Sequence, residues 1–206
     1  MPQDIVVATG NQGKLREIRQ VLADLPVDLL SLQNFPNLKM PVEDGDSFAA
    51  NARLKAEYVV RKTGKWVLAD DSGLVVFHLG GEPGIYSARY AGPDAGDQEN
   101  NQLLLARMRG VPAAQRAAEF VCVLVLAAPT KEIFTFEGRC QGRIAYGLRG
   151  DEGFGYDPLF LLPPDFTGTM AEISLQEKQQ ISHRGRALLQ LHDWLHKCTS
   201  SRNSLD

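Results

Sequence analysis

The chain has 206 residues, of which 44% are hydrophobic, and a formal net charge of −3 at pH 7. This size and composition are typical of one soluble globular domain, and the small negative charge argues against a protein that binds duplex nucleic acid through a broad positive surface. A phosphate-bearing partner must therefore meet a local cluster of cations.

The cysteines and the first residues bear on the compartment. Cys122, Cys140 and Cys198 are odd in number and far apart, unlike the close pairs of a zinc site or a disulfide framework, so we expect a reducing cytoplasm. Residues 1–4 lead into no long apolar segment, and no stretch approaches the roughly 18 apolar residues that a membrane span requires. We therefore expect a cytoplasmic protein with neither a membrane nor a nucleic acid as partner.

The first part of the chain predicts a strand, a tight turn and two helices. Residues 5–8 form a short apolar run rich in β-branched residues, residues 9–14 interrupt it with two glycines, and apolar residues then recur at helical spacing over 15–25. A second helix follows a polar cap at 46–47 and ends at Gly64.

The middle of the chain predicts further strands and one more helix. An apolar run over 67–69 reads as a buried strand that ends at the carboxylates of Asp70 and Asp71. A helix is predicted within 94–110, and the pattern then changes to strands at 120–128 and 133–144, joined as a hairpin. The hairpin makes the predicted sheet mixed rather than purely parallel.

The last quarter predicts a glycine-rich loop at 153–158, a short strand at 159–162 and a final helix at 182–198. Residues 199–206 read as a polar C-terminal tail. The sequence thus predicts one α/β domain over 1–198, in two lobes around a cleft.

The turn at 9–14 is a candidate anion site. Free amides and the positive dipole end at a helix start favour phosphate, and a phosphate would explain why Lys14 stands where the dipole disfavours a cation. The spacing is not that of a Walker A loop, because Ala8 and Leu15 occupy positions that need glycine and Ser or Thr. The alternative is a glycine turn with a surface lysine.

Asp70 and Asp71 are candidates for chemistry. Two buried carboxylates cost several kcal/mol each unless a cation or donors compensate them, and Mg²⁺ is commonly held by one or two carboxylates. Because side chains alternate along a strand, we expect only one to be catalytic and choose Asp71, with Asp70 holding backbone donors or a lysine. The alternative is an ordinary turn.

The second helix and its cap offer further ligands. Asn51 and Lys55 lie four residues apart and therefore project from one helix face, where Lys55 could hold a phosphate. Glu43, ahead of the cap, could hold a metal ion. The alternative is a solvated helix face.

The start of the final helix again places cations where acids are usual. Ser182 is a plausible cap, His183 and Arg184 follow it, and Lys178 lies just upstream, so this region could meet phosphates or the polar edge of a base. The alternative is a basic surface patch.

The loop at 153–157 interleaves two glycines with Phe154 and Tyr156, which would allow close backbone approach and stacking on a planar ring. The alternative is a turn that packs both aromatic side chains into the core.

Together these motifs resemble the inosine triphosphate pyrophosphatases, also called non-canonical purine nucleoside triphosphate pyrophosphatases. The resemblance runs from residue 5 to about 195 in the family's order. The matching motifs are Thr9-Gly10-Asn11-x-x-Lys14, Glu43-x-Gly45-x-Ser47-Phe48-x-x-Asn51-Ala52-x-x-Lys55-Ala56, Ala69-Asp70-Asp71-Ser72-Gly73-Leu74, Pro83-Gly84-Ile85-Tyr86-Ser87-Ala88-Arg89-Tyr90-Ala91-Gly92, Gly153-Phe154-Gly155-Tyr156-Asp157-Pro158-x-Phe160 and Ser182-His183-Arg184.

The resemblance implies hydrolysis of ITP, dITP or XTP to the monophosphate and pyrophosphate, with Mg²⁺ as cofactor. It also implies an elongated mixed sheet flanked by helices, an active-site cleft between two lobes, and a homodimer. By similarity, Asp71 is the general base and a metal ligand with Glu43, while the residue ahead of Glu43, sometimes a further carboxylate, is Val42 here. The implied substrate-binding residues, with Asn51 and Lys55 added from the helix pattern, are Thr9, Gly10, Asn11, Gln12, Gly13, Lys14, Ser72, Phe154, Gly155, Tyr156, Asp157, Lys178, His183 and Arg184.

Two other functions stay open at the level of sequence. A related pyrophosphatase for other modified or pyrimidine triphosphates would differ only in its base pocket. A nucleotide-binding protein without catalysis is the second alternative, although an acidic cluster would repel a polyanion unless a metal ion were present.

Overall fold

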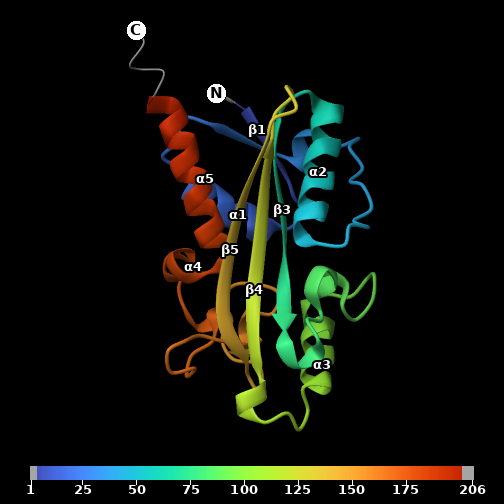
Figure 1. The fold of residues 1–206 in the computed structure, drawn as a ribbon, viewed down its shortest axis with the longest axis vertical. Coiled ribbons are helices and arrows are strands. Elements are labelled where there is room, and N and C mark those ends of the chain that lie inside the picture. Colours follow the sequence, from blue (N-terminus) through green and yellow to red (C-terminus); the bar gives the residue numbers. More distant parts are fainter. Residues whose placement is uncertain (1–3, 201–206) are drawn as a thin grey trace. The chain divides into compact units, whose positions relative to one another are not determined.

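A computed structural model describes residues 4–200, and the side chains of residues 4–198. Over these residues a six-stranded sheet has the order β2-β1-β3-β4-β5-β6, and helices flank it (Figure 1). The strands are β1 (Asp4–Ala8), β2 (Asp28–Ser31), β3 (Trp66–Val76), β4 (Ala117–Ala127), β5 (Ile133–Ile144) and β6 (Phe160–Leu161), and the α-helices are α1 (Gln12–Val21), α2 (Phe48–Thr63), α3 (Asp97–Arg107), α4 (Leu175–Ile181) and α5 (His183–Ser200). Strand β1 pairs in parallel with β2 and β3, whereas β5 and β6 are antiparallel, so the predicted mixed α/β fold is confirmed.

The chain divides into two compact units. Unit 1 comprises the described parts of Met1–Asp71, Cys122–Gly138 and Arg184–Asp206, and unit 2 comprises Ser72–Val121 and Arg139–His183. Strands β3, β4 and β5 each contribute residues to both units. The cleft between two lobes stays a prediction.

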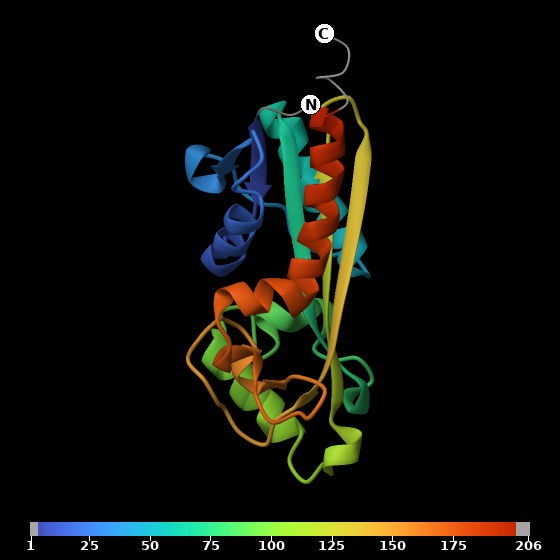
Figure 2. The same ribbon diagram turned by 90° about the vertical axis from the view of Figure 1, so that its left-hand side faces the viewer.

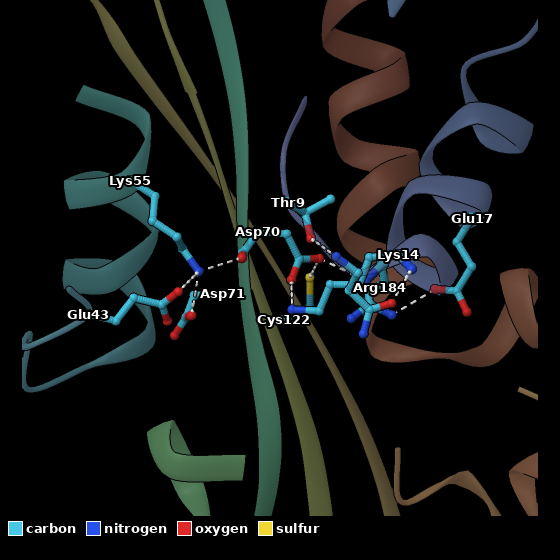
Figure 3. A network of polar contacts seen from close by, with 10 residues as sticks. Thr9, Lys14, Glu17, Glu43, Lys55, Asp70, Asp71, Cys122 and Arg184 are labelled. Atoms are coloured by element: carbon cyan, nitrogen blue, oxygen red, sulfur yellow. Dashed lines mark hydrogen bonds and ion pairs between the residues drawn. The ribbon is translucent and has the colours of Figure 1, made fainter. Parts of the chain in front are cut away.

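Unit 1 has a core between the sheet and helices α1 and α5. Ile18 of α1, Leu68 of β3 and Leu191 of α5 are fully buried in one hydrophobic cluster. Helix α5 runs alongside the first part of β5 (Figures 1 and 2), where the Trp194 and Phe134 ring centroids are 4.3 Å apart. Helix α2 lies on the other side of β3 (Figure 3). Because side chains alternate along a strand, Leu68 and Asp70 face α1 and α5, whereas Asp71 faces α2.

Unit 2 has a separate core built from the later parts of β3 and β5 and the first part of β4, together with α3. Leu74, Leu104 and Phe160 are fully buried in this second cluster. Gly142 of β5 allows β6 to come close, because a Cβ atom at this position would lie 2.5 Å from the carbonyl oxygen of Leu161. The packing of unit 2 thus holds the segment after β5 against the sheet.

The structure corrects the prediction that the third strand ends at the carboxylates. Strand β3 continues through Asp70 and Asp71 to Val76, so the alternative of an ordinary turn at this point is wrong as well. The sequence pattern was misleading because both carboxylates pair with cations inside the fold. The strand can therefore continue through two buried charges.

Other boundaries also differ from the sequence prediction. Strand β2 and helix α4 were not predicted, α1 ends at Val21 rather than Leu25, and α5 extends to Ser200. The predicted tail beyond Ser200 lies outside the described residues. No helix in the described part of the chain combines the length and apolar character needed to cross a membrane.

Candidate active site

The turn between β1 and α1 leaves most of its groups accessible. Asn11 caps α1, because its Oδ1 accepts a hydrogen bond from the backbone N–H of Lys14 at 3.1 Å. The N–H of Asn11 in turn donates to the hydroxyl oxygen of Thr9 at 3.2 Å. Residues 10–12 are exposed and Gly13 is half-buried, so the amides at the start of this helix can meet an anion from solvent.

Asp70 is completely buried between two cations (Figure 3). Lys14 Nζ donates to its Oδ1 at 2.5 Å and Arg184 Nε donates to its Oδ2 at 2.7 Å. The thiol of Cys122 also lies 3.5 Å from Oδ2. Burial raises the pKa of Asp70, but the charges of Arg184 and Lys14 outweigh it and hold that pKa well below its usual value. Asp70 is therefore an ionised anchor for two cations, in line with the role predicted for it.

Arg184 is held from two sides. Its Nη1 donates to Glu17 Oε2 at 2.7 Å, and both side chains are almost fully buried. The Asp70 and Glu17 carboxylates outweigh the effect of burial, so the pKa of Arg184 lies well above its usual value. Glu17 was not singled out in the sequence, although it lies one helical turn after Lys14 on α1, where a partner for a neighbouring site can be expected.

Asp71 occupies the opposite face of β3 and meets Lys55 of α2. Lys55 Nζ lies 2.7 Å from Asp71 Oδ1, 3.2 Å from Glu43 Oε1 and 2.9 Å from the carbonyl oxygen of Asp70. One ammonium group thus serves two carboxylates. The alternative of a solvated helix face is wrong for Lys55, which is nearly buried.

The pKa values of Asp71 and Glu43 follow from their burial and from the single positive charge that Lys55 supplies to both carboxylates. Burial raises the pKa of Asp71 to about 6, with a smaller upward contribution from the Glu43 carboxylate, against the opposing effect of Lys55. For Glu43, burial also acts upward, but Lys55 and a hydrogen bond from Asp71 outweigh it and lower the pKa. The proton of the carboxylate pair therefore resides on Asp71 below about pH 6.

Asn51 ties down the loop that carries Glu43. It is completely buried, and its Oδ1 accepts a hydrogen bond from the backbone N–H of Gly45 at 2.8 Å. A Cβ atom at Gly45 would lie 2.7 Å from this Oδ1 and 2.9 Å from the Ala50 Cβ, so the close approach needs glycine. Asn51 Nδ2 has no hydrogen-bond partner among the described residues. Asn51 and Lys55, one turn apart on α2, therefore fix the same loop.

Unit 2 holds the second group of predicted residues. Lys178 Nζ lies 2.5 Å from Asp157 Oδ2 and 4.5 Å from the centroid of the Phe154 ring. Asp157 Oδ2 also accepts the backbone N–H of Phe154 at 2.9 Å. Lysine, carboxylate and ring therefore form one cluster, which leaves Phe154 half-buried at its edge.

Tyr156 and His183 are both nearly buried in unit 2. The Tyr156 hydroxyl donates to the carbonyl oxygen of Ser87 at 2.8 Å, and burial raises the pKa of this hydroxyl. The His183 ring stacks on Phe120, with centroids 4.6 Å apart and planes 12° apart. Tyr156 therefore packs into the core as the alternative interpretation held, whereas Phe154 does not. Ser72, the first residue of unit 2, is half-buried.

Helix α3 contributes two residues that the sequence prediction missed. Asp97 Oδ2 accepts the backbone N–H of Gly155 at 2.6 Å, and Asn101 Nδ2 donates to the carbonyl oxygen of the same Gly155 at 2.8 Å. The spacing of four residues on one helix face was visible in the sequence, but nothing in it indicated a contact more than fifty residues away.

The fold and these two clusters define an α/β protein with a lysine-bridged carboxylate pair in one unit and a lysine–aromatic cluster in the other. The Ham1 family model matches residues 5–194, and the chain therefore belongs to the Ham1 family.

Relatives and solved structures agree with this assignment. The chain is 50% identical over 97% of its length to a protein from Syntrophobacter fumaroxidans named dITP/XTP pyrophosphatase, covering 88% of that protein, and 53% identical over 89% of its length to a dITP/XTP pyrophosphatase from Thermus thermophilus, covering 87% of it. The structure of a HAM1 protein from Coxiella burnetii matches with a TM-score of 0.85 and 39% identity, covering 94% of this chain and 98% of that one. The Staphylococcus aureus Ham1 protein matches with a TM-score of 0.82 and 41% identity, with the same coverage of both chains.

Proposed function

We propose that the chain hydrolyses the non-canonical purine nucleoside triphosphates ITP, dITP and XTP to the monophosphate and pyrophosphate, and so clears them from the nucleotide pool. The observation that carries this proposal is Asp71, a carboxylate with a pKa of about 6 that Lys55 holds beside Glu43. Relatives that share about half of the sequence bear the name dITP/XTP pyrophosphatase, which supports the same reaction.

In this reaction Asp71 is the general base. The oxygen of a water molecule forms a bond to the α-phosphorus while its proton passes to Asp71. The bond from the α-phosphorus to the oxygen that bridges to the β-phosphate breaks, and its electron pair leaves on pyrophosphate. A carboxylate with a pKa of about 6 is ionised at neutral pH and is a stronger base than an ordinary aspartate. Lys55 orients this carboxylate through the bond to Oδ1.

Mg²⁺ is part of the proposal, because the residues present fit it. Glu43 and Asp71 offer hard carboxylate oxygens, and both pair with the ammonium group of Lys55, which supplies one positive charge for two carboxylates. No cluster of three or more potential metal-binding side chains occurs in the described part of the chain, and two protein carboxylates lie within the usual range for Mg²⁺. When bound, Mg²⁺ would lower the pKa of a coordinated water and neutralise phosphate charge.

The remaining predicted residues divide between the phosphates and the base. The turn at 9–14, with the free amides of α1, suits the triphosphate, since anions bind at helix N-termini. In unit 2 the half-buried Phe154 ring suits stacking on a base, with Lys178 beside it. His183 belongs to the same unit, where it stacks on Phe120. Nε and Nη1 of Arg184 already donate to carboxylates, so its main role in the proposal is to hold Asp70 and Glu17.

Selection of the base is then a matter of hydrogen bonding. Donors that meet the O6 acceptor of hypoxanthine or xanthine would face the amino group of adenine, and an unpaired buried donor costs about 1–3 kcal/mol. We therefore expect ATP to be a poor substrate.

Release of pyrophosphate from ITP, measured with and without Mg²⁺ and beside dATP, dTTP and GTP, tests the proposal. Mg²⁺-dependent release that is fastest with ITP supports it. Preference for dTTP or dATP would replace it with a related pyrophosphatase of other specificity, and binding of ITP without any release would leave a nucleotide-binding protein.

A homodimer and a cytoplasmic location complete the proposal. The homodimer rests on the family resemblance, and the location rests on the isolated cysteines, which are free thiols in the structure. Light scattering during gel filtration would give the mass of one chain, rather than two, if the dimer is wrong.

A further inference from the structure

Helix α3 holds the loop at residues 153–157 through both backbone polar groups of Gly155, its N–H and its carbonyl oxygen. Gly155 is half-buried. Its N–H donates to Asp97 Oδ2 at 2.6 Å, and its carbonyl accepts from Asn101 Nδ2 at 2.8 Å. Asp97 and Asn101 lie one helical turn apart and therefore reach the same point from one face of α3.

The rest of the loop has little freedom of its own. Gly153 and Gly155 both have positive φ angles, and a Cβ atom at Gly153 would lie 2.1 Å from Asp157 Oδ2. That carboxylate fixes the N–H of Phe154 and the ammonium group of Lys178. The two contacts from α3 therefore help to fix where the Phe154 cluster stands relative to the helix, together with the bond from the Tyr156 hydroxyl to Ser87.

Asn101 would lower the stability of the fold if its only role were to pack in the core. It is buried, and its Oδ1 has no hydrogen-bond partner among the described residues. A buried acceptor without a donor lowers stability, so packing alone would favour an apolar residue here. The hydrogen bond from Asn101 Nδ2 to the carbonyl oxygen of Gly155 explains why an amide side chain stands at this position.

We propose that Asp97 and Asn101 are positioning residues for base selection: they hold Gly155, and through it the Phe154 ring and Lys178, in the place that binds the purine. This inference rests on the proposed function. Both side chains bond to Gly155, and the proposed function assigns the phosphates to other residues, so their effect is expected on binding and selectivity rather than on the chemical step.

The neighbouring residue Asn100 supplies a matched control. It is equally buried on the same helix, and its side-chain amide likewise bonds to backbone: it accepts from Ala91 N at 2.8 Å and donates to Ala88 O at 3.2 Å. Asn100→Ala removes the same groups as Asn101→Ala but leaves Gly155 untouched.

The test compares steady-state hydrolysis of ITP and GTP by wild type, Asp97→Ala, Asp97→Asn, Asn101→Ala and Asn100→Ala. We expect Asp97→Ala and Asn101→Ala to raise KM for ITP about tenfold and to reduce the ITP/GTP ratio of kcat/KM, with kcat for ITP within about threefold of wild type. Asp97→Asn keeps an acceptor for the Gly155 N–H and should restore wild-type values. Hydrogen–deuterium exchange of residues 153–157 should be faster in the two alanine variants and unchanged in Asn100→Ala.

The outcomes separate this inference from the function on which it rests. If wild type releases no pyrophosphate from ITP, the proposed function fails. If wild type is active but Asp97→Ala keeps wild-type KM and selectivity, or Asn100→Ala shifts them equally, the positioning role is wrong. Asp97 is exposed, so its variants decide the question even if Asn101→Ala does not fold.

Discussion

Asp70 and Asp71 are neighbours in the sequence but lie on opposite faces of β3 (Figure 3), and their pKa values are shifted in opposite directions. Both carboxylates are buried, and burial alone would raise the pKa of each. The difference lies in the charges around them. On the face of Asp70, two cations meet two carboxylates, because Lys14 pairs with Asp70 and Arg184 pairs with both Asp70 and Glu17. On the face of Asp71, one ammonium group meets two carboxylates.

The comparison shows how a strand can serve structure and chemistry with adjacent residues. Where the charges balance, the carboxylate is locked in its ionised form and the ion pairs hold elements together. Where negative charge is in excess, the carboxylate keeps its affinity for a proton and remains attractive to a cation. A base and a metal ligand are expected on the unbalanced face only.

The largest expected effect comes from breaking the balanced face. Asp70→Asn leaves the buried charge of Arg184 with one carboxylate fewer and should lower the free energy of unfolding by about 3–5 kcal/mol. Urea denaturation followed by circular dichroism measures this loss. As a control, Asp4→Asn removes the 2.6 Å ion pair with Lys65, which is exposed enough that the change should stay within about 1 kcal/mol. Equal losses in the two variants would contradict the role of Asp70.

The second largest effect is expected from a substitution on the face of Asp71, where negative charge is in excess. Asp71→Asn should leave the fold intact but reduce kcat for ITP at least about a hundredfold, the usual scale for loss of a general base. Pyrophosphate release gives kcat, and the melting temperature shows whether the fold is kept. Near wild-type turnover would rule out the role of Asp71 as the base.

Much of this comparison could be predicted from the sequence because it depends on local periodicity. The alternation of a strand puts Asp70 and Asp71 on opposite faces, and helical spacing puts Asn51 and Lys55 on one face. The strand, turn and helix at the start of the chain were predictable for the same reason.

The rest could not be predicted, because it depends on contacts between residues far apart in the chain. Glu17 and Arg184 are 167 residues apart, and Asn101 and Gly155 are 54 apart. The course of β3 beyond Asp71 was missed because the cations that allow it come from α1, α2 and α5. Strand β2 has only four residues with little burial, too few to show a period of two.

A smaller effect should follow from moving Glu43 without changing its charge. Gly45→Ala places a methyl group 2.7 Å from Asn51 Oδ1, so the loop that carries Glu43 must shift away from α2. Because residues that orient a metal ligand typically change metal affinity 10- to 100-fold, we expect the Mg²⁺ concentration for half-maximal activity to rise about tenfold. Gly147→Ala is the control, since a Cβ atom there meets no heavy atom within 4 Å. The same Mg²⁺ dependence in both variants would show that the loop does not position the metal ligand.

The final prediction concerns how stability depends on pH, and here the two faces should have opposite signs. The pKa of Asp70 is lowered in the folded chain, so its contribution to stability is present above the ordinary value of 3.8 and is lost as pH falls below it. The pKa of Asp71 is raised from 3.8 to about 6, so folding is favoured by protonation and the free energy of unfolding declines as pH rises from about 4 to about 6.

Urea denaturation of metal-free protein across this range should therefore show a decline in wild type that Asp71→Asn removes. Glu43→Gln should also weaken the decline, because loss of the neighbouring negative charge lowers the pKa of Asp71. If Asp71→Asn kept the full decline between pH 4 and 6, another group would be responsible, and the contrast between the two faces of β3 would have to be drawn from their ion pairs alone.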